Sequence, residues 1–360
     1  MILISHRGNL NGVNSINENN PSYLMSALNK GFDVEVDVRF ENNKFYLGHD
    51  YSQHEITKEF LINPRIWCHA KTHEALNALH NINAHYFWHQ EDDYTITSKG
   101  YIWTYPSKKL LPNSICVLPE NANYKSLNCL GICSDFIEKY KSVLLECLQS
   151  LLNRDNPDPL KRNGLMSYDS SRTDGGGEIT TYDSLDHSLG QARNNIYLAG
   201  KCWASYLALE QLLGQLDEVE AAASARSGAV RCAESLEAAY DESLGFIPAV
   251  LENNNQSAII PAAEALVYPW QMGLKDAVDE EGPYGGYIRM LKRHLQNILN
   301  SRMCLYEDGG WKLSSSADNS WMSKISISQF VVREILGMSY EGEDRADAAH
   351  VSWQVKGSEF

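Results

Sequence analysis

Short apolar runs, typical of buried strands, recur along the first 145 residues and are separated by segments with helical periodicity. The strand candidates are Ile2–Ser5, Asp33–Val38, Phe45–Leu47, Ile66–His69, Tyr86–Trp88, Tyr101–Thr104, Ile115–Leu118 and Gly131–Cys133. The helix candidates are Pro21–Lys30, Thr57–Leu61, Thr72–Asn81 and a segment from Phe136 onward. This alternation predicts a parallel sheet, and the number of strands indicates a small or trimmed TIM-barrel-like α/β domain over residues 1–145.

Residues 146–177 form a polar junction, and the pattern beyond it is almost purely helical. The junction contains two prolines after Arg154 and the glycine run Asp174–Glu178, which are linker signals. The predicted helices that follow are Ser188–Leu213, Glu218–Asp241, Ala262–Leu274, Tyr284–Asn300 and Ser320–Leu336. Paired helices joined by long loops with aromatic and acidic residues indicate an all-α domain of α/α toroid type over residues 178–353.

Composition and charge narrow the classes of function. The chain has 360 residues, of which 43% are hydrophobic and 21% charged, which suits two globular domains. Its net charge of -15 argues against binding to nucleic acid or to anionic membranes, since both need a basic face. No apolar segment approaches the ~20 residues of a membrane span. Eight cysteines without a Cys-x-x-Cys pair read as buried thiols, and we expect a cytoplasmic protein.

Polar side chains gather at the ends of the predicted strands, where barrel enzymes place their catalytic groups. They are His6, Arg7, Glu35, Asp37, His49, Asp50, His69, Lys71, His89, Glu91, Glu120 and Asp135. Glu35 and Asp37 are two residues apart on one strand, so their side chains project from the same face and could share a divalent cation.

Four motifs in this region, His6-Arg7-Gly8, Glu18-Asn19, Gly31–Val38 and Gly48-His49-Asp50, resemble the glycerophosphodiester phosphodiesterase family of phosphatidylinositol-phospholipase-C-like barrels. The resemblance implies His6 and His49 as general acid and base on a phosphodiester, and Glu35 and Asp37 as ligands of Mg or Ca. A phosphodiester needs positive charge on its oxygens, which suits a hard cation, Arg7 and Lys71. Where the family has a Glu-x-Lys pair this chain has His69-Ala-Lys71, so His69 replaces the third carboxylate ligand.

Residues 178–353 closely resemble the C-terminal helical domain of glycoside hydrolase family 52, the retaining β-xylosidases. The matching segments are Thr180–Asp186, Ser188–Asn195, Lys201–Trp203, Phe246–Val250, Ile259–Ala262, Asp308–Ser314, Asp318–Trp321 and Ala346–Val351. The resemblance implies a xylo-oligosaccharide substrate, no cofactor, and Asp183 as general acid/base. Asp186 is the reserve, although a carboxylate in this position is more often a helix cap. Trp311 and Trp321 lie in loops and are candidates to stack on a sugar ring.

A retaining mechanism also needs a nucleophile ~5 Å from the acid. In that family the nucleophile is a glutamate from a β-sandwich domain that precedes the helical domain. Residues 1–145 do not resemble that domain, so Glu178 or Glu264 would have to act as the nucleophile. We therefore expect an incomplete toroid with feeble xylosidase turnover. Two alternatives stay open, namely a metal-dependent phosphodiesterase in the first part and a non-catalytic carbohydrate-binding module. Apolar helix faces left by an incomplete ring would favour a homo-oligomer.

The last residues, 354–360, end in Gly-Ser-Glu-Phe, which two adjacent cloning sites commonly encode. This tail is therefore a candidate vector-derived scar.

Overall fold

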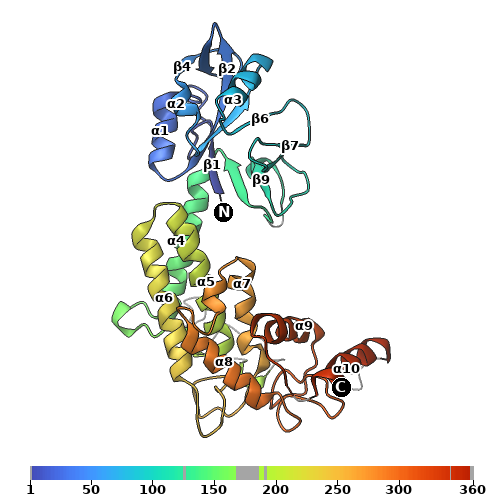
Figure 1. The fold of residues 1–360 in the computed structure, drawn as a ribbon. Coiled ribbons are helices and arrows are strands. Elements are labelled where there is room, and N and C mark those ends of the chain that lie inside the picture. The colour runs from blue at the N-terminus through green and yellow to red at the C-terminus, as the bar shows by residue number, and fades with distance from the viewer. Residues whose placement is uncertain (1, 125–126, 168–185, 190–192, 341, 357–360) are drawn as a thin grey trace. The chain divides into compact units, whose positions relative to one another are not determined.

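The computed structural model describes residues 2–124, 127–167, 186–189, 193–340 and 342–356 (Figure 1). The chain divides into two compact units. The first comprises Met1–Leu145 and Leu212–Glu218, and the second comprises Glu146–Gln211 and Val219–Phe360. No helix among the described residues is long and apolar enough to cross a membrane.

The first unit is built on one sheet. Seven strands lie parallel in the order β6-β5-β2-β1-β10-β9-β8, and β3, β4 and β7 add antiparallel pairs at its margins. The strands are β1 Ile2–His6, β2 Asp33–Glu41, β3 Lys44–Leu47, β4 His54–Ile56, β5 Ile66–Ala70, β6 Tyr86–Trp88, β7 Tyr94–Ile96, β8 Ile102–Thr104, β9 Ser114–Val117 and β10 Gly131–Ser134. The helices are α1 Pro21–Asn29, α2 Lys58–Leu61, α3 His73–Asn81 and a short 3-10 turn, Pro119–Asn121.

The two faces of this sheet are filled by alternate residues of each strand. Val34, Val36 and Val38 of β2 belong to a core cluster that also contains residues of α1 and α3. The opposite face carries a smaller aromatic cluster, in which Phe87 of β6 stacks on Trp103 of β8 with ring centroids 4.5 Å apart. Since β6 and β8 are the two ends of the parallel series, the sheet curves until its ends approach each other. A complete or trimmed barrel remains a prediction.

The second unit has no named strand among its described residues. Its α-helices are α5 Ile196–Gln215, α6 Val219–Ala238, α7 Val267–Gln271, α8 Gly285–Ile298, α9 Met322–Phe330 and α10 Glu343–Lys356. Shorter 3-10 or π segments are η2 Pro159–Lys161, η3 His187–Leu189, η4 Ile260–Leu266, η5 Lys275–Val278 and η6 Val331–Ile335. Helix α4, Ile137–Asp155, runs from the end of the first unit into the second. The arrangement of these helices as an α/α toroid remains a prediction.

Three predicted boundaries differ from the structure for local reasons. Helix α5 starts at Ile196 rather than Ser188, because the Asn195 side chain caps it by accepting from the backbone N–H of Tyr197 at 2.9 Å. Residues 146–155 of the predicted junction are helical, and α4 ends at Asp155, whose carboxylate accepts from the N–H of Gly164 at 2.9 Å. The helix expected over 262–274 is a 3-10 segment followed by α7, which ends before Gly273 at φ +79°.

Candidate functional site

The carboxyl ends of β1, β2 and β5 bring together most of the charged residues predicted from the sequence. We call this group, with Glu18 and Asp135, the strand-end cluster: His6, Arg7, Glu18, Glu35, Asp37, His69, Lys71 and Asp135. The registers His6↔Glu35 and Asp37↔His69 place these residues side by side on adjacent parallel strands. Their alternation with Val34, Val36 and Val38 puts the acids of β2 on the face opposite the large core.

His6 is held by a carboxylate far away in the sequence. Its Nδ1 lies 2.8 Å from Asp135 Oδ1, and its Nε2 lies 3.8 Å from Glu35 Oε2. Burial lowers the pKa of His6, but the hydrogen bond to Asp135 and the charge of Glu35 outweigh it, so the net pKa is raised. Asn9 donates to the same Asp135 oxygen at 2.7 Å and fixes its position. The second imidazole nitrogen is thus the one available for proton transfer.

Asp37 is fully buried and surrounded by cations. Arg7 Nε lies 2.8 Å from its Oδ2, His69 Nδ1 lies 3.4 Å from its Oδ1, and Lys71 Nζ lies 3.6 Å from that same oxygen. Burial would raise the pKa of this carboxyl, but the contacts with His69 and Arg7 hold it well below its ordinary value. Asn19 donates to Oδ2 at 2.9 Å and accepts from the Asp37 backbone N–H. Asp37 is therefore an ionised carboxylate in a fixed orientation.

Glu35, Asp37 and His69 lie close enough together that they could hold a metal ion. One ligand atom from each lies within 4.8 Å of the others, and all three residues are buried. Glu35 Oε2 and Asp37 Oδ1 make no hydrogen bond to any described residue. Two buried carboxylate oxygens that make ion-pair contacts but no well-formed hydrogen bond fit a divalent cation. The contacts of His69 with both acids raise its pKa to about 9, so a cation would bind there in competition with a proton.

A cavity of about 630 Å³ lies over this cluster. It is lined by His6, Arg7, Glu35, His49, His69, Ala70, Lys71, Trp88, His89, Gln90, Trp103, Tyr105, Val117 and Leu118. His49 is one of these lining residues, and its Nδ1 is 2.8 Å from Asp50 Oδ1. His6 and His49, the two predicted acid/base residues, therefore line one cavity, and each is paired with an aspartate through Nδ1.

Several supporting residues could not be given a role from the sequence. Asn9, Asn19 and Glu18 orient the charged groups: Asn9 donates to Glu18 at 2.9 Å, and Arg7 donates to Glu18 at 3.2 Å. Glu18 and Asn19 appeared only as an adjacent motif, and Asp135 only as an acid after a strand. Their partners lie up to 129 residues away along the chain, so only the fold reveals the contacts.

Of the two aspartates predicted in the second unit, Asp183 lies outside the described residues, as does Glu178. Asp186 is 1% exposed and its two oxygens are occupied. Oδ1 accepts from the Ser188 backbone N–H at 2.9 Å and from its hydroxyl at 2.6 Å, while Oδ2 accepts from the hydroxyls of Ser314 and Ser316. Burial would raise the pKa of Asp186, but these hydrogen bonds lower it. Asp186 is thus held ionised, which suits an anchor rather than a proton donor.

Glu264, the other substitute nucleophile considered, is also fully engaged. It is 2% exposed, its Oε1 accepts from Lys201 Nζ at 2.7 Å, and both of its oxygens accept from Lys324 Nζ at 2.9 Å. Lys201 further donates to Tyr268 and Lys324 to Tyr197, each at 2.8 Å. A carboxylate bound to two ammonium groups is a weakened nucleophile, because its lone pairs are occupied.

The two predicted sugar platforms differ in accessibility. Trp311 is completely buried, and its Nε1 donates to Tyr340 Oη at 2.9 Å, so its ring has no face for a sugar. The stacking role predicted for Trp311 does not fit this position, because a loop residue can still be covered by a later helix. Trp321 is 43% exposed at the start of α9 and remains a candidate.

Comparison with known proteins bears on the second unit. The chain is 52% identical over 217 residues to a β-xylosidase from Geobacillus stearothermophilus, covering 60% of this chain and 31% of that protein. Part of this chain is therefore related to a glycosidase. A second β-xylosidase from the same organism is 41% identical over 78 residues, which are 22% of this chain and 12% of that protein. The chain thus spans about a third of the length of the first relative and about an eighth of the second. No family model matches the chain.

The length of the first match shows which residues it must include. A continuous match over 217 of 360 residues necessarily includes residues 144–217, whatever its limits. The glycosidase relationship therefore covers Asp183, Asp186 and helix α5, and it is too long to lie within the first unit alone.

Proposed function

We propose that the second unit is of β-xylosidase type, with Asp183 as general acid/base of a retaining mechanism. We expect its turnover of β-xylosides to be feeble, because a retaining mechanism also needs a nucleophile and Glu264 is bound by Lys201 and Lys324. The observation that carries this proposal is the 52% identity to a β-xylosidase over a stretch that includes Asp183. The described geometry supports Asp183 over its neighbour, because Asp186 accepts four hydrogen bonds and is held ionised. A general acid must carry a proton that it can give to the leaving oxygen.

The test is release of the aglycone from aryl β-xylosides by the wild-type chain and by Asp183→Asn. We expect the variant to lose activity on a p-nitrophenyl xyloside and to lose much less on a dinitrophenyl xyloside, because that leaving group needs little protonation. Glu242→Gln is the control, since this carboxylate is exposed and pairs with Arg293 on the surface. Equal losses on both substrates, or none, would exclude Asp183 as the proton donor.

A second candidate function, phosphodiester hydrolysis in the first unit, is favoured by one specific observation. His6 and His49 line the same cavity, and each is paired through Nδ1 with an aspartate at 2.8 Å. Such a pair can accept a proton from an attacking hydroxyl and give one to the leaving oxygen. Arg7 and Lys71 supply positive charge to the phosphoryl oxygens. A divalent cation held by Glu35, Asp37 and His69 would add charge stabilisation when bound.

Hydrolysis of an aryl phosphodiester tests this second function. We expect turnover to stop in His6→Gln and in His49→Gln, and to stop after chelation with recovery on addition of Ca or Mg. His54→Gln, a change on the margin strand β4, is the matched control and should be silent. Turnover that survives both the chelator and His6→Gln would rule out the strand-end cluster as its source.

A further inference from the structure

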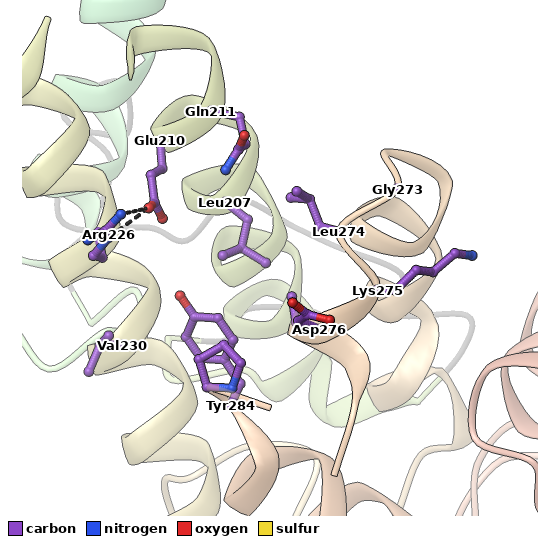
Figure 2. A pocket seen from close by; sticks show the side chains of 12 residues that line it. Leu207, Glu210, Gln211, Arg226, Val230, Gly273, Leu274, Lys275, Asp276 and Tyr284 are labelled. Atoms are coloured by element: carbon purple, nitrogen blue, oxygen red, sulfur yellow. Dashed lines mark hydrogen bonds and ion pairs between the residues drawn. The ribbon is translucent and has the colours of Figure 1, made fainter. Parts of the chain in front are cut away.

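The second unit contains a cavity of about 520 Å³ that is distinct from the cavity over the strand-end cluster. Figure 2 shows it between α5, α6, the turn after α7 and the segment before α8. Its lining shares no residue with the strand-end cluster, and it includes neither Asp186 nor Glu264. The volume lies in the range of about 300–1,000 Å³ that is typical of small-molecule sites.

The floor of this cavity is apolar and fixed. Leu207 of α5 and Ala277 of η5 are buried, and the Tyr284 ring is only 8% exposed. Trp203 meets that ring edge-on, with centroids 5.5 Å apart and planes at 85°. A floor held this firmly needs little ordering when a ligand binds.

Unengaged polar groups surround the floor. The Tyr284 hydroxyl points into the cavity (Figure 2) and makes no hydrogen bond to a described residue. Burial and the charge of Glu210 raise its pKa to about 12, so it is a neutral donor at physiological pH. The side chains of Gln211 and Asp276 also line the cavity and make no hydrogen bond to described residues. These groups offer donors and acceptors together.

The charges around the cavity balance. Arg226 lies against Glu210, with its Nε at 2.7 Å and its second guanidinium nitrogen at 2.6 Å from the same oxygen, Oε1. Lys275 lies 3.2 Å from the centre of the Trp270 ring, next to Asp276 in the sequence. Two carboxylates and two cations give no net attraction for a charged ligand. A neutral molecule with hydroxyl groups around an apolar body fits this arrangement.

We propose that this cavity is a binding site for a neutral sugar in its pyranose form. The C–H face of a pyranose matches the Leu207 and Tyr284 floor, and its ring of hydroxyls matches Tyr284 Oη, Gln211 and the carboxylates of Glu210 and Asp276. The balanced charges exclude a preference for uronic acids or phosphorylated sugars. This proposal holds whether or not the chain hydrolyses xylosides.

Binding of methyl β-xyloside and methyl β-glucoside, measured by saturation-transfer NMR on the full chain, tests the site. We expect binding to persist in Asp183→Asn and to weaken about two- to tenfold in Tyr284→Phe, which removes one hydrogen bond and keeps the ring. Tyr287→Phe is the matched control, because Tyr287 is buried in the first turn of α8 and does not line the cavity. Methyl glucuronoside should bind no better than the neutral sugars.

A blocking variant decides the case if Tyr284→Phe perturbs folding. Val230 on α6 is 37% exposed and lines the cavity, so Val230→Trp should fill it and abolish sugar binding. Val219→Trp, on the exposed first residue of the same helix, should leave binding intact. Sugar binding that is unchanged in Val230→Trp, or lost equally in Val219→Trp, would overturn the proposal.

Discussion

Glu264 is a buried carboxylate whose removal should strongly destabilise the second unit. It is 2% exposed, and the two ammonium groups that it binds belong to Lys201 and Lys324, whose side chains are 22% and 11% exposed. Removing one partner of a buried ion pair costs about 3–5 kcal/mol, because the remaining charge stays buried without its counter-ion. We therefore expect Glu264→Ala to lower the free energy of unfolding of this unit by about 3–5 kcal/mol.

The loss can be measured as a shift of the urea midpoint. With slopes of about 1–3 kcal/mol per molar urea, the midpoint should fall by about 1 M or more. Hydrogen exchange of peptides from α5 and α9, which carry Lys201 and Lys324, assigns the loss to this unit, while peptides from β1 and β2 should be unchanged. Glu242→Gln is the control, because its pairing with Arg293 is on the surface and should contribute nothing measurable.

A charge-free replacement separates electrostatics from packing. If buried charge is the cause, Glu264→Leu combined with Lys201→Met and Lys324→Met should recover most of the stability lost in Glu264→Ala. The reasoning is refuted if Glu264→Ala stays within about 1 kcal/mol of wild type, since that value would be typical of a surface pair.

Three further predictions concern the second unit. Burial lowers the pKa of His294 in the folded protein to about 4. As pH falls from about 6.5 to about 4, this imidazole is protonated in the unfolded chain but not in the folded one. The free energy of unfolding should therefore fall by roughly 3 kcal/mol over that range. His294→Gln should flatten that part of the pH profile of the urea midpoint. The pKa of Asp186 is lowered, so its contribution exists above pH ~4 and disappears as pH falls through the folded value. The stability gap between wild type and Asp186→Asn should therefore be wide at pH 7 and narrow at pH 3; an unchanged gap contradicts this account. A methyl group at Gly228 would lie 2.7 Å from the Tyr206 ring, so Gly228→Ala should cost about 1–3 kcal/mol in denaturation experiments, whereas Gly214→Ala, with open space around it, should not destabilise.

The regular elements were largely readable because their signals are local. The parallel strands were predicted from apolar runs, and the period of two separates Glu35 and Asp37 from the valines of β2. Strands β4 and β7 were missed. Each has three residues, lies at a margin of the sheet and buries little, so no apolar run marks it. Helix α10 was noticed only as a resemblance, since its apolar residues are few.

The contacts that define each site could not be read in the same way. The sequence placed His6 at a strand end, but the aspartate that orients it comes from the other end of the unit. Trp311 was expected on a rim because a glycine-rich loop precedes it, whereas Gly310 packs against Trp353 and the ring is buried by residues near the C-terminus. In both cases the deciding contact joins distant segments, and no local pattern encodes it.

Charge counting in the strand-end cluster explains why a cation should matter for its chemistry. At neutral pH the carboxylates of Glu18, Glu35, Asp37 and Asp135 face three cations, namely Arg7, Lys71 and the protonated His69. An incoming phosphodiester would add another negative charge to a group that is already acidic, so the protein alone offers little net attraction. A divalent cation beside Glu35 and Asp37 would offset that negative charge. Diethyl phosphate, used as an unreactive probe in calorimetry, should therefore bind measurably only when Ca or Mg is present, and Asp37→Asn should remove the dependence on the cation together with the binding. If diethyl phosphate binds equally well with and without cation, the positive charge must come from the protein itself, and Glu35 and Asp37 would be structural partners of Arg7 and His69 rather than ligands.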